Sequence, residues 1–205
     1  MMILDILFRL YLIACIFLPC LIYQAFILKR KEETIFISSM VWRWVFLLYL
    51  YLVINVTGVG TLEDILSYPD LTRPEEINLS SFQTGVGMLN VLNIIMFTPL
   101  GFLLPLIWKQ CRRLGFVVLL GCEFSLMIEF LQLFNRRATD IDDLLMNTLG
   151  AFIGFFLWKL SKKIIHRAPK EIQVFPRQEP QIYLFLSLTG VFFLYHWRYF
   201  LRLVS

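Results

Sequence analysis

This 205-residue sequence has little charge, little histidine and few cysteines. Charged residues make up 17% of the chain, whereas a soluble domain typically contains about 25%. The two histidines have no ligand spacing around them, and the four cysteines lack the spacing of a zinc site. These shortages argue against a disulfide framework, a zinc site and a soluble catalytic domain. We expect no nucleic-acid partner.

Apolar residues are abundant instead. They account for 59% of the chain, and the mean hydropathy is +0.72. A soluble core of this size cannot bury so much apolar surface, so the lipid bilayer is the expected solvent and partner. Six apolar runs are long enough to cross it, since a crossing needs about 20 residues. They are 3–28, 41–57, 88–108, 114–134, 141–160 and 182–203.

The runs predict an all-α integral membrane protein, built as a bundle of about six transmembrane helices. Five helices are expected if the first or the second run does not span. We divide the chain into an N-terminal helix pair (1–57), an extracellular loop (58–87), a core of three helices (88–160), and a basic cytoplasmic loop with the last helix (161–205). Residues 61–66 are expected to start a short helix at the membrane surface.

The basic residues predict the orientation. Thirteen of the 19 lysines and arginines fall between the first and second, third and fourth, or fifth and sixth runs, including those at the run ends. Loop 58–87 is acidic. The positive-inside rule therefore places the basic connections in the cytoplasm and loop 58–87 outside. We expect a multi-pass protein of the cytoplasmic membrane with both termini outside.

Each of the three central runs places a set of polar side chains at its predicted extracellular end. Their spacings of three and four place them on one face of each helix. The set comprises Asn90 and Asn93 in the third run, Ser125, Glu129 and Gln132 in the fourth, and Asp140, Asp143 and Asn147 in the fifth. Ionisable groups inside a membrane usually face a bundle interior or an aqueous cavity. We predict one outward-opening polar pocket.

Several neighbouring residues leave alternatives open. Arg136 and Arg137 lie in the turn between the fourth and fifth runs and suit a phosphate or carboxylate. Asp140 and Asp142 could instead serve as helix caps in a first turn. No metal site is predicted, although Glu129, Asp140 and Asp143 are weak candidates as oxygen ligands of a divalent cation. Glu123 falls near mid-membrane, where we expect it to be buried.

Three ordered segments resemble the VanZ family of bacterial membrane proteins. They are N-V-L-N-I-I-M-F-T-P-L-G-F-L-L-P (90–105), S-L-M-I-E-F-L-Q (125–132) and R-x-x-D-I-D-D-L-L-M-N-T-L-G (137–150). The resemblance covers about a third of the chain. It implies a link to resistance against the glycopeptide teicoplanin without a rebuilt peptidoglycan precursor. It assigns no catalytic role to the residues that match the family's polar signature: Asn90, Asn93, Glu129, Gln132, Arg137, Asp140, Asp142, Asp143 and Asn147.

Three kinds of function fit these features. The first is a non-enzymatic envelope protein whose outer pocket engages a lipid-linked cell-wall precursor or a lipoglycopeptide antibiotic. The second is a membrane enzyme acting on a polyprenyl-phosphate or lipid substrate with a carboxylate-bound metal. The third is a lipid flippase or transporter, although the sequence shows no paired broken helices or inverted repeat, which many transporters have. We favour the first, because no histidine base or nucleophile stands near the carboxylates. The oligomeric state does not follow from the sequence.

Overall fold

The computed structural model describes residues 2–31, 37–67, 77–78, 87–135, 139–164, 178–196 and 198. Each of the six apolar runs forms a helix in these ranges: α1 (Met2–Lys31), α2 (Ile37–Thr57), α4 (Met88–Ile107), α5 (Leu114–Gln132), α6 (Ile141–Ile164) and α7 (Glu179–Leu194). Five of the described helices are long and apolar enough to cross a membrane, and α7, with 16 residues, is shorter. The chain is an all-α integral membrane protein, as predicted.

Short elements cover one end of the bundle. The helix expected at 61–66 is present as α3 (Leu62–Ser67). The Thr61 hydroxyl accepts from the Asp64 main-chain nitrogen (3.3 Å), while the Asp64 carboxylate accepts from the Thr61 main-chain nitrogen (2.9 Å). Two-residue strands β1 (Ile77–Asn78) and β2 (Thr139–Asp140) pair in parallel. Single 3₁₀ turns, η2 (Lys109–Cys111) and η3 (Leu133–Asn135), follow α4 and α5.

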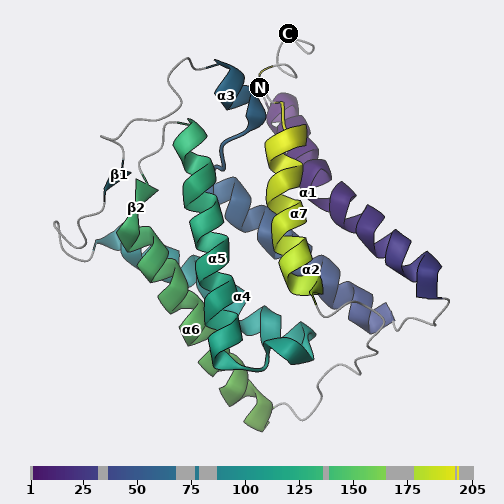
Figure 1. Cartoon of the computed structure of the whole chain (residues 1–205), viewed down its shortest axis with the longest axis vertical. Coiled ribbons are helices and arrows are strands. Elements are labelled where there is room, and N and C mark those ends of the chain that lie inside the picture. The colour runs from purple at the N-terminus through teal and green to yellow at the C-terminus, as the bar shows by residue number, and fades with distance from the viewer. Residues whose placement is uncertain are drawn as a thin grey trace.

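The bundle has two chemically different ends (Figure 1). The start of α1, the end of α7, α3 and the two strands lie at one end, which we call the α3 end. The end of α1, the start of α2, η2, the end of α6 and the start of α7 lie at the other, which we call the basic end. Chain segments that we predicted on the same side of the membrane therefore lie at the same end of the bundle, as the predicted topology requires. Which end faces the outside stays a prediction.

Helix α7 differs in its bounds from the predicted run 182–203. It begins at Glu179, with Pro180 in its first turn, where the missing amide hydrogen costs nothing. It ends at Leu194, whereas the predicted run continued to residue 203. The Tyr11 hydroxyl of α1 donates to the Leu194 carbonyl and accepts from the His196 main-chain nitrogen. A tertiary contact from α1 therefore satisfies the end of α7.

Helices α4 and α6 pack with their backbones in close contact. A Cβ on Gly101 of α4 would lie 1.9 Å from the Ala151 carbonyl oxygen. On α6, a Cβ on Gly150 would lie 2.4 Å from the Ile94 carbonyl oxygen, and one on Gly154 would lie 2.0 Å from that of Thr98. Glycine is required here because any side chain would push the helices apart. The Gly-x-x-x-Gly spacing at 150–154 thus serves packing within the chain.

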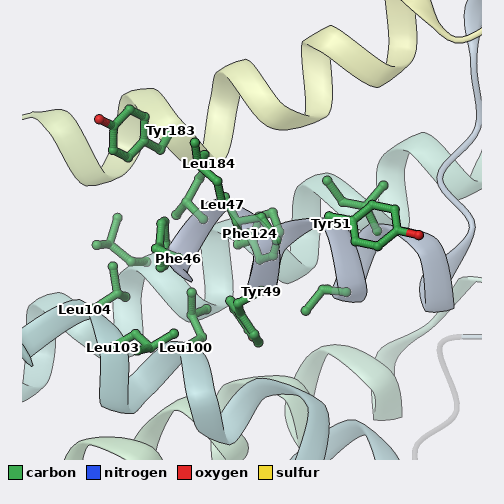
Figure 2. Packing of buried hydrophobic residues seen from close by; sticks show 14 of the residues in the cluster. Phe46, Leu47, Tyr49, Tyr51, Leu100, Leu103, Leu104, Phe124, Tyr183 and Leu184 are labelled. Carbon is green, nitrogen blue, oxygen red and sulfur yellow. The ribbon is translucent and has the colours of Figure 1, made fainter. Parts of the chain in front are cut away.

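Helix α2 forms the apolar centre of the bundle (Figure 2). Its Phe46 and Leu47 are fully buried between the leucines of α4 and the start of α7. Tyr49 of α2 reaches α4, where its hydroxyl donates to the Met96 carbonyl (2.9 Å). Helix α2 ends at Thr57, and the next residue, Gly58, has a φ of 61°, the left-handed conformation that closes many helices.

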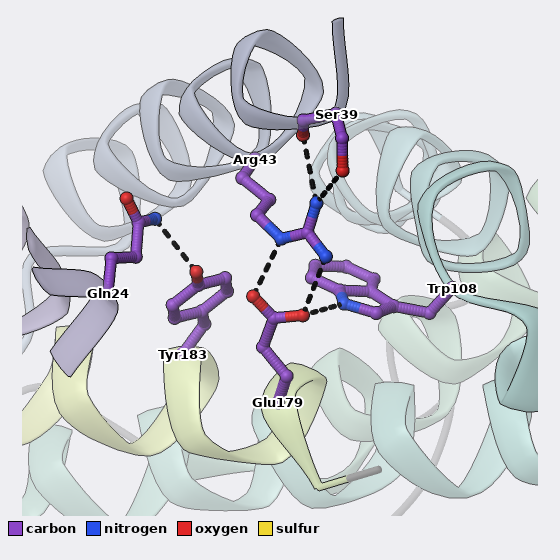
Figure 3. Close-up of polar contacts among 6 residues, drawn as sticks. All are labelled: Gln24, Ser39, Arg43, Trp108, Glu179 and Tyr183. Atoms are coloured by element: carbon purple, nitrogen blue, oxygen red, sulfur yellow. Dashed lines mark hydrogen bonds and ion pairs between the residues drawn. The ribbon is translucent and has the colours of Figure 1, made fainter. Parts of the chain in front are cut away.

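A buried ion pair joins α2 to α7 near the basic end (Figure 3). The Arg43 guanidinium donates through Nε to one Glu179 carboxylate oxygen (2.7 Å) and through Nη2 to the other (3.1 Å). Trp108, at the end of α4, donates its indole hydrogen to Glu179 as well (2.6 Å). Nearby, Gln24 of α1 donates to the Tyr183 hydroxyl of α7 (2.7 Å). The start of α7 is therefore tied to three other helices.

Replacing Gly154 with alanine is expected to lower the melting temperature of the purified protein in detergent. The added methyl group meets the α4 backbone, and such overpacking costs about 1–3 kcal/mol. Gly115→Ala is the matched control, because a Cβ there meets nothing within 4 Å. Equal melting temperatures for the two variants would show that α4 and α6 are not held this closely.

Replacing either Arg43 or Glu179 with methionine is expected to destabilise the protein by about 3–5 kcal/mol, because the remaining buried charge loses its partner. The double variant should recover much of that loss, since two apolar side chains leave no charge unpaired. The exposed pair Asp5–Arg9 (3.2 Å) is the control, and breaking it should cost at most about 1 kcal/mol. Thermal unfolding in detergent measures all of these variants. Additive losses in the double variant would contradict the pairing.

Candidate functional site

Polar side chains of α4, α5 and α6 meet at the α3 end of the bundle. We call this group the α4–α6 polar cluster. It comprises Asn93, Ser125, Glu129, Asp140, Asp143 and Asn147, and we include Asn90, which lies three residues before Asn93 on α4. The Asn93 amide of α4 donates to the Asp143 carboxylate of α6. The glycine packing of α4 on α6 makes this contact possible, because Gly150 lies two turns further along α6 from Asp143 and holds the helices together there.

Glu129 connects α5 to the start of α6. Its side chain is only 4% exposed, and its carboxylate accepts from the Asp140 main-chain nitrogen (3.3 Å). The Asp140 carboxylate in turn accepts from the Asp142 main-chain nitrogen (3.0 Å), as expected of a residue that caps α6. The capping role considered for Asp140 is therefore present. The arrangement gathers the carboxylates of Glu129, Asp140 and Asp143 at one end of the bundle.

Two buried side-chain atoms of the cluster, one on α6 and one on α4, have hydrogen-bonding capacity that no described residue uses. The Asn147 amide, 3% exposed, donates to the Ser125 hydroxyl (2.9 Å), which joins α6 to α5. The Asn147 carbonyl oxygen is buried and has no partner among the described residues. The Asn90 amide nitrogen on α4 is likewise buried without a partner there. A buried polar atom that lacks a partner is uncommon and calls for an explanation, such as a ligand or ion.

Gln132, predicted to line the pocket, contacts a different element. Its amide donates to the Thr57 carbonyl at the end of α2 (2.8 Å). Asn135, which was not among the predicted residues, donates in the same way to the Gly58 carbonyl (2.6 Å). Both side chains satisfy carbonyls that the end of a helix leaves free. Asn135 continues the spacing of three and four that joins Ser125, Glu129 and Gln132, but it lies beyond the predicted run 114–134 and was therefore not considered.

The predicted arginines Arg136 and Arg137 lie outside the described residues. Strand β2, which follows the two arginines in sequence, pairs with β1 from the 58–87 segment, and Asn78 lies opposite Asp140. Part of this long segment therefore passes beside the polar cluster. Sequence reasoning gave no register for this contact, because two-residue strands carry no periodic signal.

Glu123 is a correction to the sequence analysis. We expected it to be buried, but it is exposed on α5. Glu123 lies on the same face of α5 as Leu120 and Met127. This face lines a cavity between α5 and α7. Ser125 and Glu129 lie on the opposite side of the helix, buried against α6. Because α7 packs mainly on α1 and α2, it leaves this part of α5 uncovered.

The carboxylates of the cluster do not form a metal-binding arrangement. Among the described residues, no three histidine, cysteine, aspartate or glutamate side chains are placed to hold a metal ion. Asn93 and the Asp140 main-chain nitrogen instead supply hydrogen-bond donors to Asp143 and Glu129. Chemically, the cluster can accept hydrogen bonds from hydroxyl, amide or ammonium groups and can donate through Asn90.

Fold and site together define a multi-pass α-helical membrane protein with a buried polar cluster at one end. The family model described as VanZ/LLP1 matches residues 8–162, and this chain belongs to that family. The match begins well before the three segments that carried the resemblance. Protein VanZ of Enterococcus faecium is 37% identical over 91 residues, which are 42% of this chain and 55% of that protein. The matched region thus spans about half the length of that relative. No solved structure gives a significant match.

Proposed function

We propose that this protein contributes to resistance against glycopeptide antibiotics of the teicoplanin type. In this proposal the α4–α6 polar cluster engages the polar headgroup of an amphiphile in the outer leaflet. The family and the similarity to Protein VanZ support the link to resistance. The observation that supports the binding role is the convergence of amides and carboxylates from three helices in a membrane-embedded bundle, where two buried amide atoms have no hydrogen-bond partner among the described residues.

The chemistry of the cluster suits a sugar or peptide headgroup. Carboxylates such as Glu129 and Asp143 accept hydrogen bonds from hydroxyl and amide groups, and Asn90 has a donor to offer. Both a lipid-linked cell-wall precursor and a lipoglycopeptide antibiotic carry such groups on an apolar chain. Arg136 and Arg137, next in sequence, would add a site for a phosphate or carboxylate. Ile77 and Asn78 of the 58–87 segment lie beside Thr139 and Asp140, at the edge of the proposed binding site.

Binding accounts for the geometry of the carboxylates better than metal-dependent catalysis does. The described carboxylates are engaged with amide donors and do not converge as a set of ligands. To contribute to resistance, a binding protein needs only to change the amount of precursor or antibiotic that is accessible at the outer leaflet.

Glu129→Gln and Asp143→Asn are each expected to reduce the teicoplanin resistance that the protein confers on a susceptible bacterial host. A lost hydrogen bond to a charged group costs about 1.5–3 kcal/mol, which is about ten- to a hundredfold in affinity. The measurement is the minimal inhibitory concentration, taken at matched protein abundance. Asp5→Asn is the control, because this exposed carboxylate lies at the same end of the bundle, outside the cluster.

Native mass spectrometry of the purified protein separates the two parts of this proposal. We expect a co-purified amphiphile on the wild-type chain and less of it on the two cluster variants. Unchanged inhibitory concentrations for well-expressed variants would contradict a role for the cluster in resistance. An equal amount of bound amphiphile on wild type and variants would contradict the binding site itself.

We also propose that the α3 end faces the outside of the cytoplasmic membrane. A cysteine at Leu66, which is 78% exposed on α3, should react with a membrane-impermeant maleimide on intact cells. A cysteine at the exposed Lys109, at the basic end, should react only after the membrane is permeabilised. The wild-type chain, whose cysteines are buried or half-buried, gives the background. The reverse pattern would invert the proposed orientation.

A further inference from the structure

Two basic side chains from different elements come together at the basic end of the bundle. Arg112 follows η2, and Lys162 lies at the end of the α6 span. Helix α6 packs on α4 at Gly154, where a Cβ would lie 2.9 Å from the Phe102 main-chain nitrogen. Both helices run from the α3 end to the basic end, so two further turns bring Lys162 level with η2. There the positive charges of Arg112 and Lys162 act on each other.

Contacts within the chain hold both side chains in place. The half-buried Arg112 donates through Nε to the Pro105 carbonyl (3.3 Å), and its two terminal nitrogens have no hydrogen-bond partner among the described residues. The Lys162 ammonium lies over the ring of the buried Trp158, 4.4 Å from its centroid. A charge that only sets membrane orientation needs to lie near the end of a span but needs no fixed position. The placement of these two side chains therefore calls for a further role.

No described carboxylate balances the two charges. Glu179 is the carboxylate that the structure describes at this end, and it is fully buried and bonded to Arg43 and Trp108. Neither Arg112 nor Lys162 forms an ion pair with a described residue. Like charges that are held near each other are destabilising, and an anion between them relieves the repulsion. The planar fork of an arginine suits the oxygens of a phosphate in particular.

The two basic residues lie at the level of the lipid headgroups. The α6 span ends at Lys162, and the α5 span begins two residues after Arg112. Towards the bundle centre, Phe152 and Phe156 are 39% and 44% exposed, and Lys159 continues their spacing of four and three on the same face of α6. The two phenylalanine rings contact each other, with centroids 4.8 Å apart. An apolar strip therefore leads along α6 to the basic residues.

We propose that Arg112 and Lys162 bind the phosphate of an anionic membrane lipid, whose acyl chain lies along Phe152 and Phe156. The phosphate oxygens accept from the terminal nitrogens of Arg112 and from the Lys162 ammonium, and the exposed Lys159 adds attraction. Basic sites between membrane helices recognise lipid headgroups in this way. A soluble phosphate could make the same polar contacts but would gain nothing from the apolar strip. The site lies at the opposite end from the α4–α6 polar cluster, so its test is independent of the proposed function.

The test is lipid binding by the full-length protein in detergent, titrated with phosphatidylglycerol or phosphatidylcholine and read by native mass spectrometry. About 0.5 M ammonium acetate screens the long-range attraction between exposed charges. We expect the wild type to bind phosphatidylglycerol more tightly than phosphatidylcholine. Arg112→Gln and Lys162→Gln should each raise the dissociation constant for phosphatidylglycerol about tenfold, because each removes hydrogen bonds between charged groups. Neither should change the binding of phosphatidylcholine.

Two further variants separate a specific site from general positive charge. Lys29→Gln is the matched control, because this exposed lysine lies at the same end, on α1, and its loss changes the net charge equally. It should leave the dissociation constant unchanged. Arg112→Lys keeps the charge but loses the fork, so its affinity should fall below that of the wild type. Equal affinity of the wild type, Arg112→Gln and Lys162→Gln for phosphatidylglycerol would overturn the proposal, as would an equal loss in Lys29→Gln.

Thermal unfolding distinguishes lipid binding from a structural role. Phosphatidylglycerol should raise the melting temperature of the wild type and of Lys29→Gln, because a ligand that binds only the folded state stabilises it. Without added lipid, Lys162→Gln should melt with the wild type, and the lipid should then raise its melting temperature less. An equal rise in all variants would overturn the proposal. Inorganic phosphate at the same concentration should not displace the lipid from the wild type, and displacement would assign the site to a soluble anion instead.

Discussion

The close contact between the backbones of α4 and α6 is the constraint on which the polar end of this protein depends. Gly101, Gly150 and Gly154 allow the two helices to approach until carbonyl oxygens of one occupy the space of a side chain on the other. At that distance the Asn93 amide reaches the Asp143 carboxylate. If leucines stood in place of these glycines, the two helices would lie further apart, and the Asn93 and Asp143 side chains would not meet. The small residues in mid-membrane thus fix the geometry of the polar residues at the end.

Two polar networks hold opposite ends of the bundle, and they differ in composition. At the basic end, Arg43 and Glu179 balance each other's charge, and Trp108 satisfies the same carboxylate. At the α3 end, the described part of the α4–α6 polar cluster holds carboxylates with amide donors, and some amide atoms stay unsatisfied. The first network stabilises the packing of α7, and Gln24 beside it keeps one buried side-chain oxygen without a partner among the described residues. The second has hydrogen-bonding capacity left for a ligand, which is why the proposed function rests on it.

The polar faces of the three central helices could be predicted because spacing of three and four is a local property. Asn93, Glu129, Asp143 and Asn147 were each assigned to a shared face, and each contributes to the cluster. Gln132 obeyed the same spacing, yet its amide satisfies the end of α2. Periodicity gives the direction of a side chain on its own helix. It does not identify the helix that stands opposite.

The sequence by itself determined that this chain crosses a membrane as helices, where those helices lie, and which end of the bundle carries the polar residues. Composition, run length and the distribution of lysine and arginine are sufficient for that, because the bilayer imposes its own length and polarity on any chain. The tertiary structure alone decided that Arg43 pairs with Glu179, 136 positions away, and that Glu123 faces outward. Both depend on where α7 packs. Helix packing depends on the complementarity of whole helix surfaces, which cannot be predicted from the spacing of residues within one segment.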